Sequence, residues 1–422
     1  MFSPHRWKAS VRERFEGFFE FSKDADYFYL VEPLLKPLYL FANPLRCVKD
    51  FGLPAGVLVQ LVRFLCLLPY ASYVYVAYWN IEQRAKIPEC IITVGTVLVF
   101  TLSIIRCWVL NVYNRELGDL RAFFNDRTYQ EQDEWVHRTR ARFYRRWNWI
   151  ISLFLVLSVL DVVIFVATNW NKPNFNVQYR GVVVRSVPVQ IASEFFSGYI
   201  GVSYMISSSI MHLVLRLFRM EFSILTRTLK LSVGEEMAGD TRQEAFRLFT
   251  GEFHANIKRH ASLLQYVNTI WKKRKAFSTF RKMFRLLALL QYHGALIVMT
   301  CICLYSAYQQ FSLATVSYTL FGAFLIFDTF LLCVCLDDLN DLNQDVGYIV
   351  YSLHWPATLE LATRGVPKER LKSVRRTILI VMQHSQQPLR IGFGEFGTLS
   401  RHRFAEMIQH IYSLIMFLCQ FK

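Results

Sequence analysis

The sequence contains few charged residues and none of the motifs that mark the common enzyme classes. Only 19% of its 422 residues are charged, whereas 53% are hydrophobic and 16% are aromatic. It has no H-E-x-x-H sequence, no nucleophile elbow and no phosphate-binding glycine loop. We therefore expect a protein that is not an enzyme and that needs no cofactor.

Patterns that bind metal or form extracellular disulfides are also missing. The nine cysteines include two close pairs, Cys301 with Cys303 and Cys333 with Cys335, but both lie in apolar stretches without histidine partners. Thiols in such settings act as small apolar side chains, so we expect no metal site. Residues 1–49 lack the apolar core of a signal peptide, which predicts a cytosolic N-terminus.

Acidic residues are scarce relative to basic ones, which gives the chain a formal net charge of +16. No zinc-finger spacing or basic arm accompanies this charge, so a nucleic-acid partner is not expected. The basic residues lie in the links between apolar stretches instead. In a membrane protein, basic links mark the cytosolic side.

Long hydrophobic runs are abundant, and seven are long enough to cross a hydrocarbon core of roughly 30 Å as helices. They are residues 54–78, 88–113, 147–170, 191–218, 286–308, 313–336 and 399–421. The sequence therefore predicts an all-α membrane protein with seven transmembrane helices. The expected divisions are a cytosolic and interfacial or re-entrant segment (1–53), helices one to four (54–218), a cytosolic helical anchor layer (219–285), helices five and six (286–336), a cytosolic anchor segment (337–397) and a last helix (398–422).

The distribution of basic residues predicts the orientation of the chain. Lysine and arginine gather in the N-terminal segment and in the links after the second, fourth and sixth spans. This asymmetry predicts a cytosolic N-terminus and a C-terminus on the opposite, outer side. A seven-helix receptor coupled to a G protein has the opposite orientation and is disfavoured. Paired glycine and proline helix breaks, which would favour a transporter with inverted repeats, are absent.

The last apolar stretch carries a polar stripe. His402, Glu406, Gln409, Ser413 and Gln420 follow one another at intervals of 4, 3, 4 and 7 residues, which keeps them on one helix face. Only Met416 and Phe417 interrupt the stripe, as an apolar constriction would. Copies of this helix around a symmetry axis would enclose a central pore. The alternative is that the stripe packs against neighbouring helices or a closed cavity.

Several C-terminal segments resemble the insect odorant receptor family. They are Tyr348–Trp355 (YIVYSLHW), Arg375–Leu389 (RRTILIVMQHSQQPL), the glycine-bearing Gly392–Leu399, Phe404, the pair Tyr412 and Ser413, and Leu418. The related gustatory receptors end in a Thr-Tyr pair followed by five apolar residues and Gln-Phe. Here Ile411 replaces the threonine and Tyr412 lies eight positions before Gln420. The co-receptor of the odorant family has a much longer loop after its fourth span, so the chain resembles a ligand-tuned subunit.

This resemblance implies a tetrameric, non-selective cation channel that a volatile ligand gates directly and that assembles with the odorant co-receptor. It implies a place in the plasma membrane of a sensory-neuron dendrite, in contact with lipid. The last helix would line the pore, with the gate at Phe417 and a polar ring at Gln420. The expected pore and gate residues are Glu406, Gln409, Ser413, Met416, Phe417 and Gln420. A gustatory-type ligand-gated channel and, behind it, a membrane transporter are the alternatives.

In the family the ligand lies in the outer half of the bundle, among helices two to six. A small apolar molecule needs a dry cavity with aromatic walls and few polar groups. The candidate residues are Ile91, Gly95, Thr96, Leu157, Asp161, Phe165, Phe195, Phe196, Tyr199, Ser203, Tyr305, Tyr308, Thr319 and Ala323. Tyr305 and Tyr308 resemble the paired tyrosines of the family, and the aromatic content favours a small aromatic or heterocyclic volatile. Two charged residues in the inner halves of their helices, Arg106 and Asp328, are hypothesised to form an ion pair.

Overall fold

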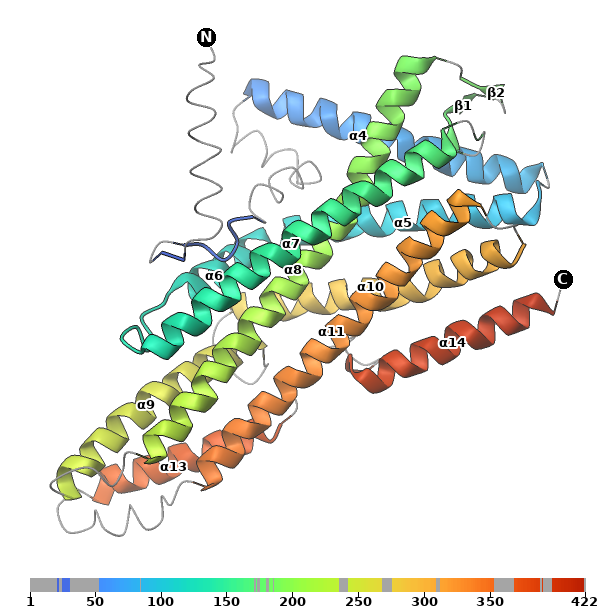
Figure 1. Ribbon diagram of the computed structural model, residues 1–422. Helices are drawn as coiled ribbons and strands as arrows, with labels where there is room; N and C mark the ends of the chain where they lie inside the picture. The colour runs from blue at the N-terminus through green and yellow to red at the C-terminus, as the bar shows by residue number, and fades with distance from the viewer. Residues whose placement is uncertain are drawn as a thin grey trace.

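The computed structural model is a bundle of long helices that run along one another (Figure 1). It describes residues 21–22, 25–30, 53–83, 85–170, 172, 175–179, 182–184, 186–234, 242–267, 275–308, 312–352, 368–387, 389 and 397–420. Ten helices and one pair of short strands lie in these ranges. The part of segment 1–53 that was expected to lie at the membrane interface, residues 27–44, is mostly outside the described residues.

Among the described residues, five helices are long and apolar enough to cross a membrane. They are α5 (Ile87–Val112), α7 (Glu134–Asn169), α8 (Val187–Gly234), α10 (Lys275–Tyr308) and α11 (Leu313–Ser352). The chain also forms helices at the expected first and last spans, α4 (Leu53–Glu82) and α14 (Arg401–Cys419). The all-helical architecture is thus confirmed in its main features, whereas the count of seven spans stays a prediction.

Several of these helices are longer than a membrane requires. At about 1.5 Å per residue, the 48 residues of α8 extend over roughly 70 Å. The 40 residues of α11 likewise exceed the roughly 20 that cross a bilayer. Helix α7 begins well before its apolar stretch, at a cap where the Asp133 carboxylate accepts hydrogen bonds from the backbone N–H groups of Trp135 and Val136. The apolar runs therefore mark only part of each helix.

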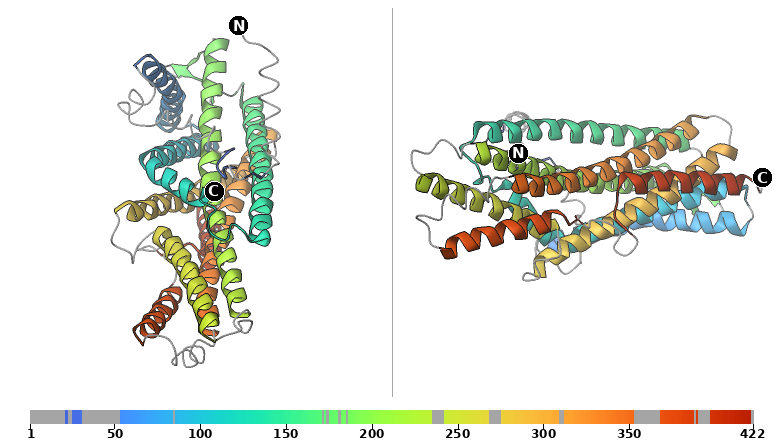
Figure 2. Two further views of the ribbon diagram at one scale, coloured as in Figure 1. Left: turned by 90° about the vertical axis from the view of Figure 1, so that its left-hand side faces the viewer. Right: turned by 90° about the horizontal axis from the view of Figure 1, so that it is seen from below.

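The two ends of the bundle differ in character. One end, called here the polar end, carries α6 (Asn114–Asn125), α9 (Arg242–Val267) and α13 (Lys368–Ser385). The other, the hairpin end, carries the strands β1 (Gln178–Tyr179) and β2 (Val182–Val183), which pair antiparallel. The end of α14 points away from α9 and α13 (Figures 1 and 2). This hairpin lies between the expected third and fourth spans.

Helix α8 lies at the centre of the bundle and α7 at its edge. In the most apolar window of α8, 83% of the residues are buried, against 11% in that of α7. The main hydrophobic core gathers around Leu213, Leu217 and Phe222 of α8, each fully buried. The outer face of α7 is left apolar and exposed, as expected of a helix that borders lipid.

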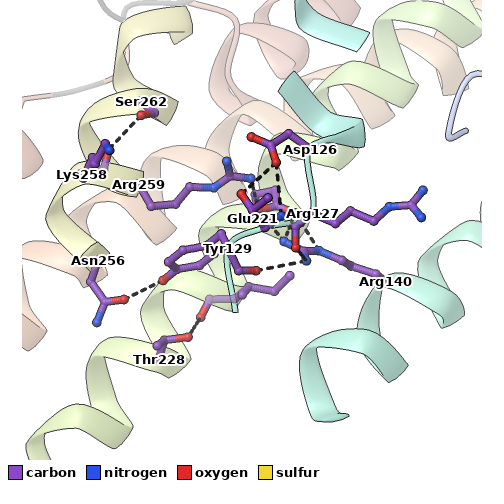
Figure 3. A network of polar contacts seen from close by, with 12 residues as sticks. Asp126, Arg127, Tyr129, Arg140, Glu221, Thr228, Asn256, Lys258, Arg259 and Ser262 are labelled. Atoms are coloured by element: carbon purple, nitrogen blue, oxygen red, sulfur yellow. Dashed lines mark hydrogen bonds and ion pairs between the residues drawn. The ribbon is translucent and has the colours of Figure 1, made fainter. Parts of the chain in front are cut away.

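A buried ionic cluster joins three helices at the polar end (Figure 3). Glu221 of α8 accepts hydrogen bonds from Arg140 of α7 at 3.1 Å and from Arg259 of α9 at 2.5 Å. All three side chains are less than a tenth exposed. Tyr129, whose hydroxyl donates to Asn256 at 2.7 Å, extends the cluster toward α9. Because a buried charge is stable only when it is paired, this cluster fixes α7, α8 and α9 relative to one another.

A second buried polar network lies at mid-depth and corrects one sequence-based hypothesis. Arg106 and Asp328 do not form the expected ion pair. Arg106 donates to Gln291 at 2.8 Å and lies 4.3 Å from the ring centroid of Tyr204. Asp328 shares a hydrogen bond of 2.7 Å with His212. Each charge is satisfied by a nearer partner on a neighbouring helix.

Candidate functional site

A cavity lies at the hairpin end, where α5, α7, α8, α10 and α11 approach one another. Its volume is about 110 Å³, and its wall is almost entirely apolar. Each of the five helices contributes residues from the turns nearest the hairpin end. The wall consists of Ile92, Gly95, Thr96, Val99, Phe100, Asp161, Val162, Phe165, Glu194, Ser197, Gly198, Gly201, Val298, Cys301, Ile302, Ser317, Tyr318 and Phe321.

Glycines let the helices come close enough to form this wall. A Cβ atom added at Gly95 of α5 would lie 3.3 Å from Cβ of Cys301 on α10. One added at Gly198 of α8 would lie only 2.8 Å from a methyl group of Val162 on α7. Gly201, one turn further along α8, leaves an ordinary distance of 3.8 Å to the same side chain. The contact between α7 and α8 at the cavity thus depends on Gly198 in particular.

Aromatic rings close the cavity toward the hairpin end. Tyr318 lies edge-on to Tyr305 at 5.2 Å between ring centroids and to Phe165 at 5.9 Å. The Tyr318 hydroxyl donates to the side chain of Asn169 at 3.2 Å. Phe175, from the link between α7 and α8, is buried against Phe165 at 5.3 Å. Edge-to-face contacts of this kind hold rings in fixed orientations and so give the cavity a defined shape.

Two carboxyl groups line the otherwise apolar cavity. Asp161 of α7 accepts a long hydrogen bond of 3.4 Å from Ser317 of α11. Glu194 of α8 is only 5% exposed, and its Oε2 atom has no hydrogen-bond partner. A buried polar group without a partner is costly in an apolar site. The cavity therefore offers an unsatisfied acceptor to a ligand that can donate a hydrogen bond.

The structure brings four of the sequence-predicted ligand residues to this cavity: Gly95, Thr96, Asp161 and Phe165. Tyr305 is buried directly behind Tyr318, while Tyr308 is half-buried near the end of α10 and does not line the wall. The other candidates lie beside the cavity or face away from it. Ile91, Phe196 and Tyr199 are half-buried, Ser203 is buried and donates to the Tyr199 carbonyl, and Leu157, Phe195, Thr319 and Ala323 are exposed.

The rotation of two helices explains most of these differences. On α11 the cavity side carries Ser317, Tyr318 and Phe321, so Thr319 and Ala323 face outward. On α8 it carries Glu194, Ser197 and Gly198, and Phe195 is 70% exposed. The residues expected on α8 are Phe195, Phe196, Tyr199 and Ser203. The actual wall there consists of small and polar residues, because α7 packs closely against it.

The last helix, α14, packs through one apolar face and exposes the opposite one. Met407 and Ile411 are buried, and Phe404 and Ile415 pack against the main core. These positions recur every three or four residues, which defines one side of a helix. The opposite side carries Gln409, Ser413, Met416, Phe417 and Gln420, all exposed. Glu406 is half-buried and bonds to Arg403 at 2.7 Å. The polar stripe therefore faces away from the rest of its own chain.

Ion pairs fix the start of α14 to the central helices. Arg401 donates to Asp338 of α11 at 2.7 Å, and its backbone N–H donates to Asp337 at 2.8 Å. Asp338 also pairs with Arg219 of α8 at 3.1 Å. Tyr292 of α10 donates to the carbonyl oxygen of Arg403 at 3.2 Å. A movement of α8, α10 or α11 at this level is therefore transmitted to the start of α14.

The comparisons with known proteins agree with this architecture. A family model described as 7tm Odorant receptor matches residues 87–412, which is more than half of the chain. Among curated proteins, none matches this chain. The fold is similar to the insect olfactory receptor OR5 from Machilis hrabei, with a TM-score of 0.65 at 12% identity over 94% of this chain and 100% of that one. The structure of the same receptor in complex with eugenol gives 0.67 at 13% identity over 93% of this chain and 98% of that one. The chain belongs to the 7tm odorant receptor family.

Proposed function

We propose that the chain is the ligand-tuned subunit of an odorant-gated, non-selective cation channel. In this proposal it spans the plasma membrane seven times, with the N-terminus inside and the C-terminus outside. It assembles as a tetramer with the odorant co-receptor, and α14 lines the pore. The observation that carries the proposal is the polar stripe of α14. Within the described part of the chain, its residues Gln409, Ser413 and Gln420 remain exposed after α14 has packed against the bundle. Around a central axis, the same stripe would line a water-filled path.

The cavity supports a small ligand with one hydrogen-bond donor. Its volume of about 110 Å³ is below that of drug-sized pockets, which are roughly 300–1,000 Å³. It is closer to an engineered cavity of about 150 Å³ that accepts benzene. Glu194 supplies the acceptor, and the rings of Phe165 and Tyr318 supply apolar contact. The preferred ligand is therefore a small aromatic volatile with a hydroxyl or amino group. Binding of eugenol by a structurally similar receptor supports the same class.

A continuous set of contacts connects the cavity with α14. Phe321 lines the cavity and lies 6.4 Å, between ring centroids, from Tyr204. The Tyr204 hydroxyl donates to Gln291 at 3.1 Å, and Gln291 donates to Thr329 of α11 at 3.0 Å. Helix α11 then reaches the ion pair with Arg401. A ligand that fits one arrangement of these contacts better than another shifts the balance between closed and open pores by that difference in affinity.

The experiment that tests the proposal is voltage-clamp recording from cells that express the chain with the co-receptor. Cells are exposed to a panel of small volatiles that pairs each phenol or aryl amine with its O- or N-methylated analogue. We expect inward cation currents that prefer the donor of each pair, and loss of that preference in Glu194→Leu, which has no acceptor at this position. Solute flux that saturates without single-channel events would support a transporter instead. An epitope at Lys422 that stays inaccessible on intact cells would refute the orientation.

A further inference from the structure

A second hollow, distant from the ligand cavity, lies near the polar end of the bundle between α7 and α8. It is an open groove of about 620 Å³. Four arginines line it: Arg142 and Arg146 from α7, and Arg216 and Arg219 from α8. Trp135 and Trp147 lie among them. Arginine forms paired hydrogen bonds with phosphate groups, and indole rings are common where protein meets the membrane surface.

The positive charge of this groove is largely uncompensated. Within the ranges that the structure describes, no ion pair involves Arg142, Arg146 or Arg216. Arg219 shares the carboxylate of Asp338, which also pairs with Arg401. Two buried arginines of this chain, Arg140 and Arg259, instead share the carboxylate of Glu221. Arg142 and Arg146 are exposed and Arg216 is half-buried, and three guanidinium groups in one open groove suit an anion that carries more than one charge.

The wall of the groove also contains a buried donor without a partner. Trp147 is 4% exposed, and its indole Nε1 has no hydrogen-bond acceptor. Arg216 lies 6.0 Å from the centroid of this ring, so the indole and a guanidinium group share one place in the wall. An unsatisfied buried N–H group beside clustered arginines is the expected environment for an anionic ligand.

The surface of α7 continues from the groove as an apolar strip. Arg142 and Arg146 share a helix face with Ile150, Leu153, Leu157 and Leu160, which follow at intervals of 4, 3, 4 and 3 residues. Ile150 lines the groove, and the three leucines are 52–59% exposed. A ligand on this face meets arginines first and then a lipid-facing apolar surface. That order is the order of a phospholipid, with its headgroup in the groove and an acyl chain along the strip.

We propose that this groove binds a phosphoinositide of the inner leaflet through its multiply phosphorylated headgroup. The headgroup phosphates contact Arg142, Arg146 and Arg216, and the acyl chains lie against Leu153 and Leu157. The proposal uses the orientation given above, which places the polar end in the cytosol. It does not depend on the identity of the volatile or on channel activity, since it concerns the opposite end of the bundle.

Two ion pairs that share Asp338 connect the same groove with α14. Arg219 lines the groove and pairs with Asp338, whose other oxygen pairs with Arg401 at the start of α14. A headgroup phosphate that binds Arg219 would break its ion pair with Asp338, and Asp338 would then pair with Arg401 only. Occupancy of the groove therefore changes how firmly α14 is fixed to α8, and this lipid would adjust the ease of opening.

The test is lipid binding by the full-length protein. The purified chain in phosphatidylcholine nanodiscs, which expose both faces of the bilayer, is titrated with fluorescent phosphatidylinositol bisphosphate. Phosphatidylserine at matched total charge and soluble inositol trisphosphate are the comparison ligands. Each arginine near an anionic headgroup contributes about fivefold in affinity, so Arg142→Gln and Arg146→Gln should each weaken binding roughly fivefold and the double variant roughly 25-fold. The matched control is Arg145→Gln, which removes the same charge from the same helix at a position outside the groove.

The outcomes separate a built site from a diffuse charge effect. Weaker binding by Arg142→Gln and Arg146→Gln, with Arg145→Gln within twofold of the unsubstituted protein, supports the proposal. Equal losses in all three variants, or equal binding of phosphatidylserine at matched charge, overturn it. Soluble inositol trisphosphate that binds as tightly as the lipid overturns the claim that a lipid is the ligand. Because both leaflets are accessible in nanodiscs, the result does not depend on the orientation of the chain. Absence of lipid binding would therefore contradict the groove proposal but not the proposed channel activity.

Discussion

The contact between Gly198 and Val162 provides the sharpest test of the ligand cavity. Gly198→Ala adds a methyl group that would lie 2.8 Å from Cγ1 of Val162, well inside normal contact distance. Valine in a helix strongly prefers one rotamer, so its side chain yields only at a cost. In the empty cavity Val162 can turn into free space, but a bound ligand fills that space. The strain of overpacking, about 1–3 kcal/mol, therefore falls mainly on the ligand-bound state.

That difference predicts a loss of potency and not of folding. A cost of about 1–3 kcal/mol raises the half-maximal volatile concentration roughly 5- to 150-fold. Concentration–response curves for the most effective volatile of the panel, recorded with the co-receptor, measure this shift. Surface biotinylation provides the measure of folding and assembly, and it should be unchanged.

Two further variants make the result specific to the contact. Gly201→Ala places its methyl group 3.8 Å from Val162, an ordinary contact, and should stay within about twofold of the unsubstituted receptor. Adding Val162→Ala to Gly198→Ala removes the opposing methyl groups and should restore potency, so the two changes are strongly non-additive. Equal potencies for Gly198→Ala and Gly201→Ala, or additive effects in the double variant, would refute the placement of the ligand beside Val162.

Three other predictions concern stability and gating. Glu221→Gln leaves Arg140 and Arg259 buried without a counter-charge and should destabilise the fold by about 3–5 kcal/mol, measured as a lower unfolding temperature. Glu134→Gln, which breaks the exposed ion pair with Arg138, is the control and should cost under about 1 kcal/mol. A Glu221→Gln variant that loses no more stability than Glu134→Gln would contradict the buried cluster. Burial lowers the pKa of His260, in α9, from 6.5 to about 4, so between these pH values the unfolded chain binds a proton that the folded chain does not. The free energy of unfolding should therefore fall by about 3 kcal/mol as the pH drops from about 6.5 to 4. His260→Gln should reduce this pH dependence of the unfolding temperature, and an unchanged dependence would contradict the assignment to His260. Phe417→Ser should raise the current without volatile, because a polar constriction stays wetted, and an unchanged basal current would place the gate elsewhere.

The positions of the membrane helices could be predicted because apolar runs and basic links are direct consequences of the hydrocarbon core. Which helix lies at the centre could not. The apolar stretch of α7 has a mean hydropathy of 2.9 and that of α8 only 1.4, but it is the packing that shows α8 enclosed and α7 bordering the outside. Serines at 203, 207, 208 and 209 are consistent with close packing of α8, since small polar residues let neighbouring helices approach.

The cavity was only partly predictable for a related reason. The candidates lie at about the depth of the cavity in each helix, but several of them, such as Thr319 and Ala323, face away from it. Rotation is set by contacts such as that between Gly198 and Val162, which join residues far apart in the sequence. Glu194 is not among the residues expected on α8, which are Phe195, Phe196, Tyr199 and Ser203. An acidic residue in an apolar run is itself a signal of a functional position.

The polar network at mid-depth shows the limit of pairing charges by depth alone. Arg106 and Asp328 are at similar depth, yet the neutral side chain of Gln291 binds the first and His212 the second. In an apolar interior any group with the right hydrogen-bond geometry can satisfy a charge. Sequence reasoning that matches only opposite signs overlooks such partners.

The proposed channel requires water to run along the exposed stripe of α14 when the pore opens. It is tested most directly by cysteine accessibility during recording, with Ser413→Cys on the stripe and Ile411→Cys on the buried face of the same helix. A charged, membrane-impermeant thiol reagent is applied from outside in the presence of an activating volatile. We expect rapid, irreversible block of the current in Ser413→Cys and none in Ile411→Cys beyond the effect on the unsubstituted receptor. Block of Ile411→Cys with no effect at Ser413→Cys would contradict it.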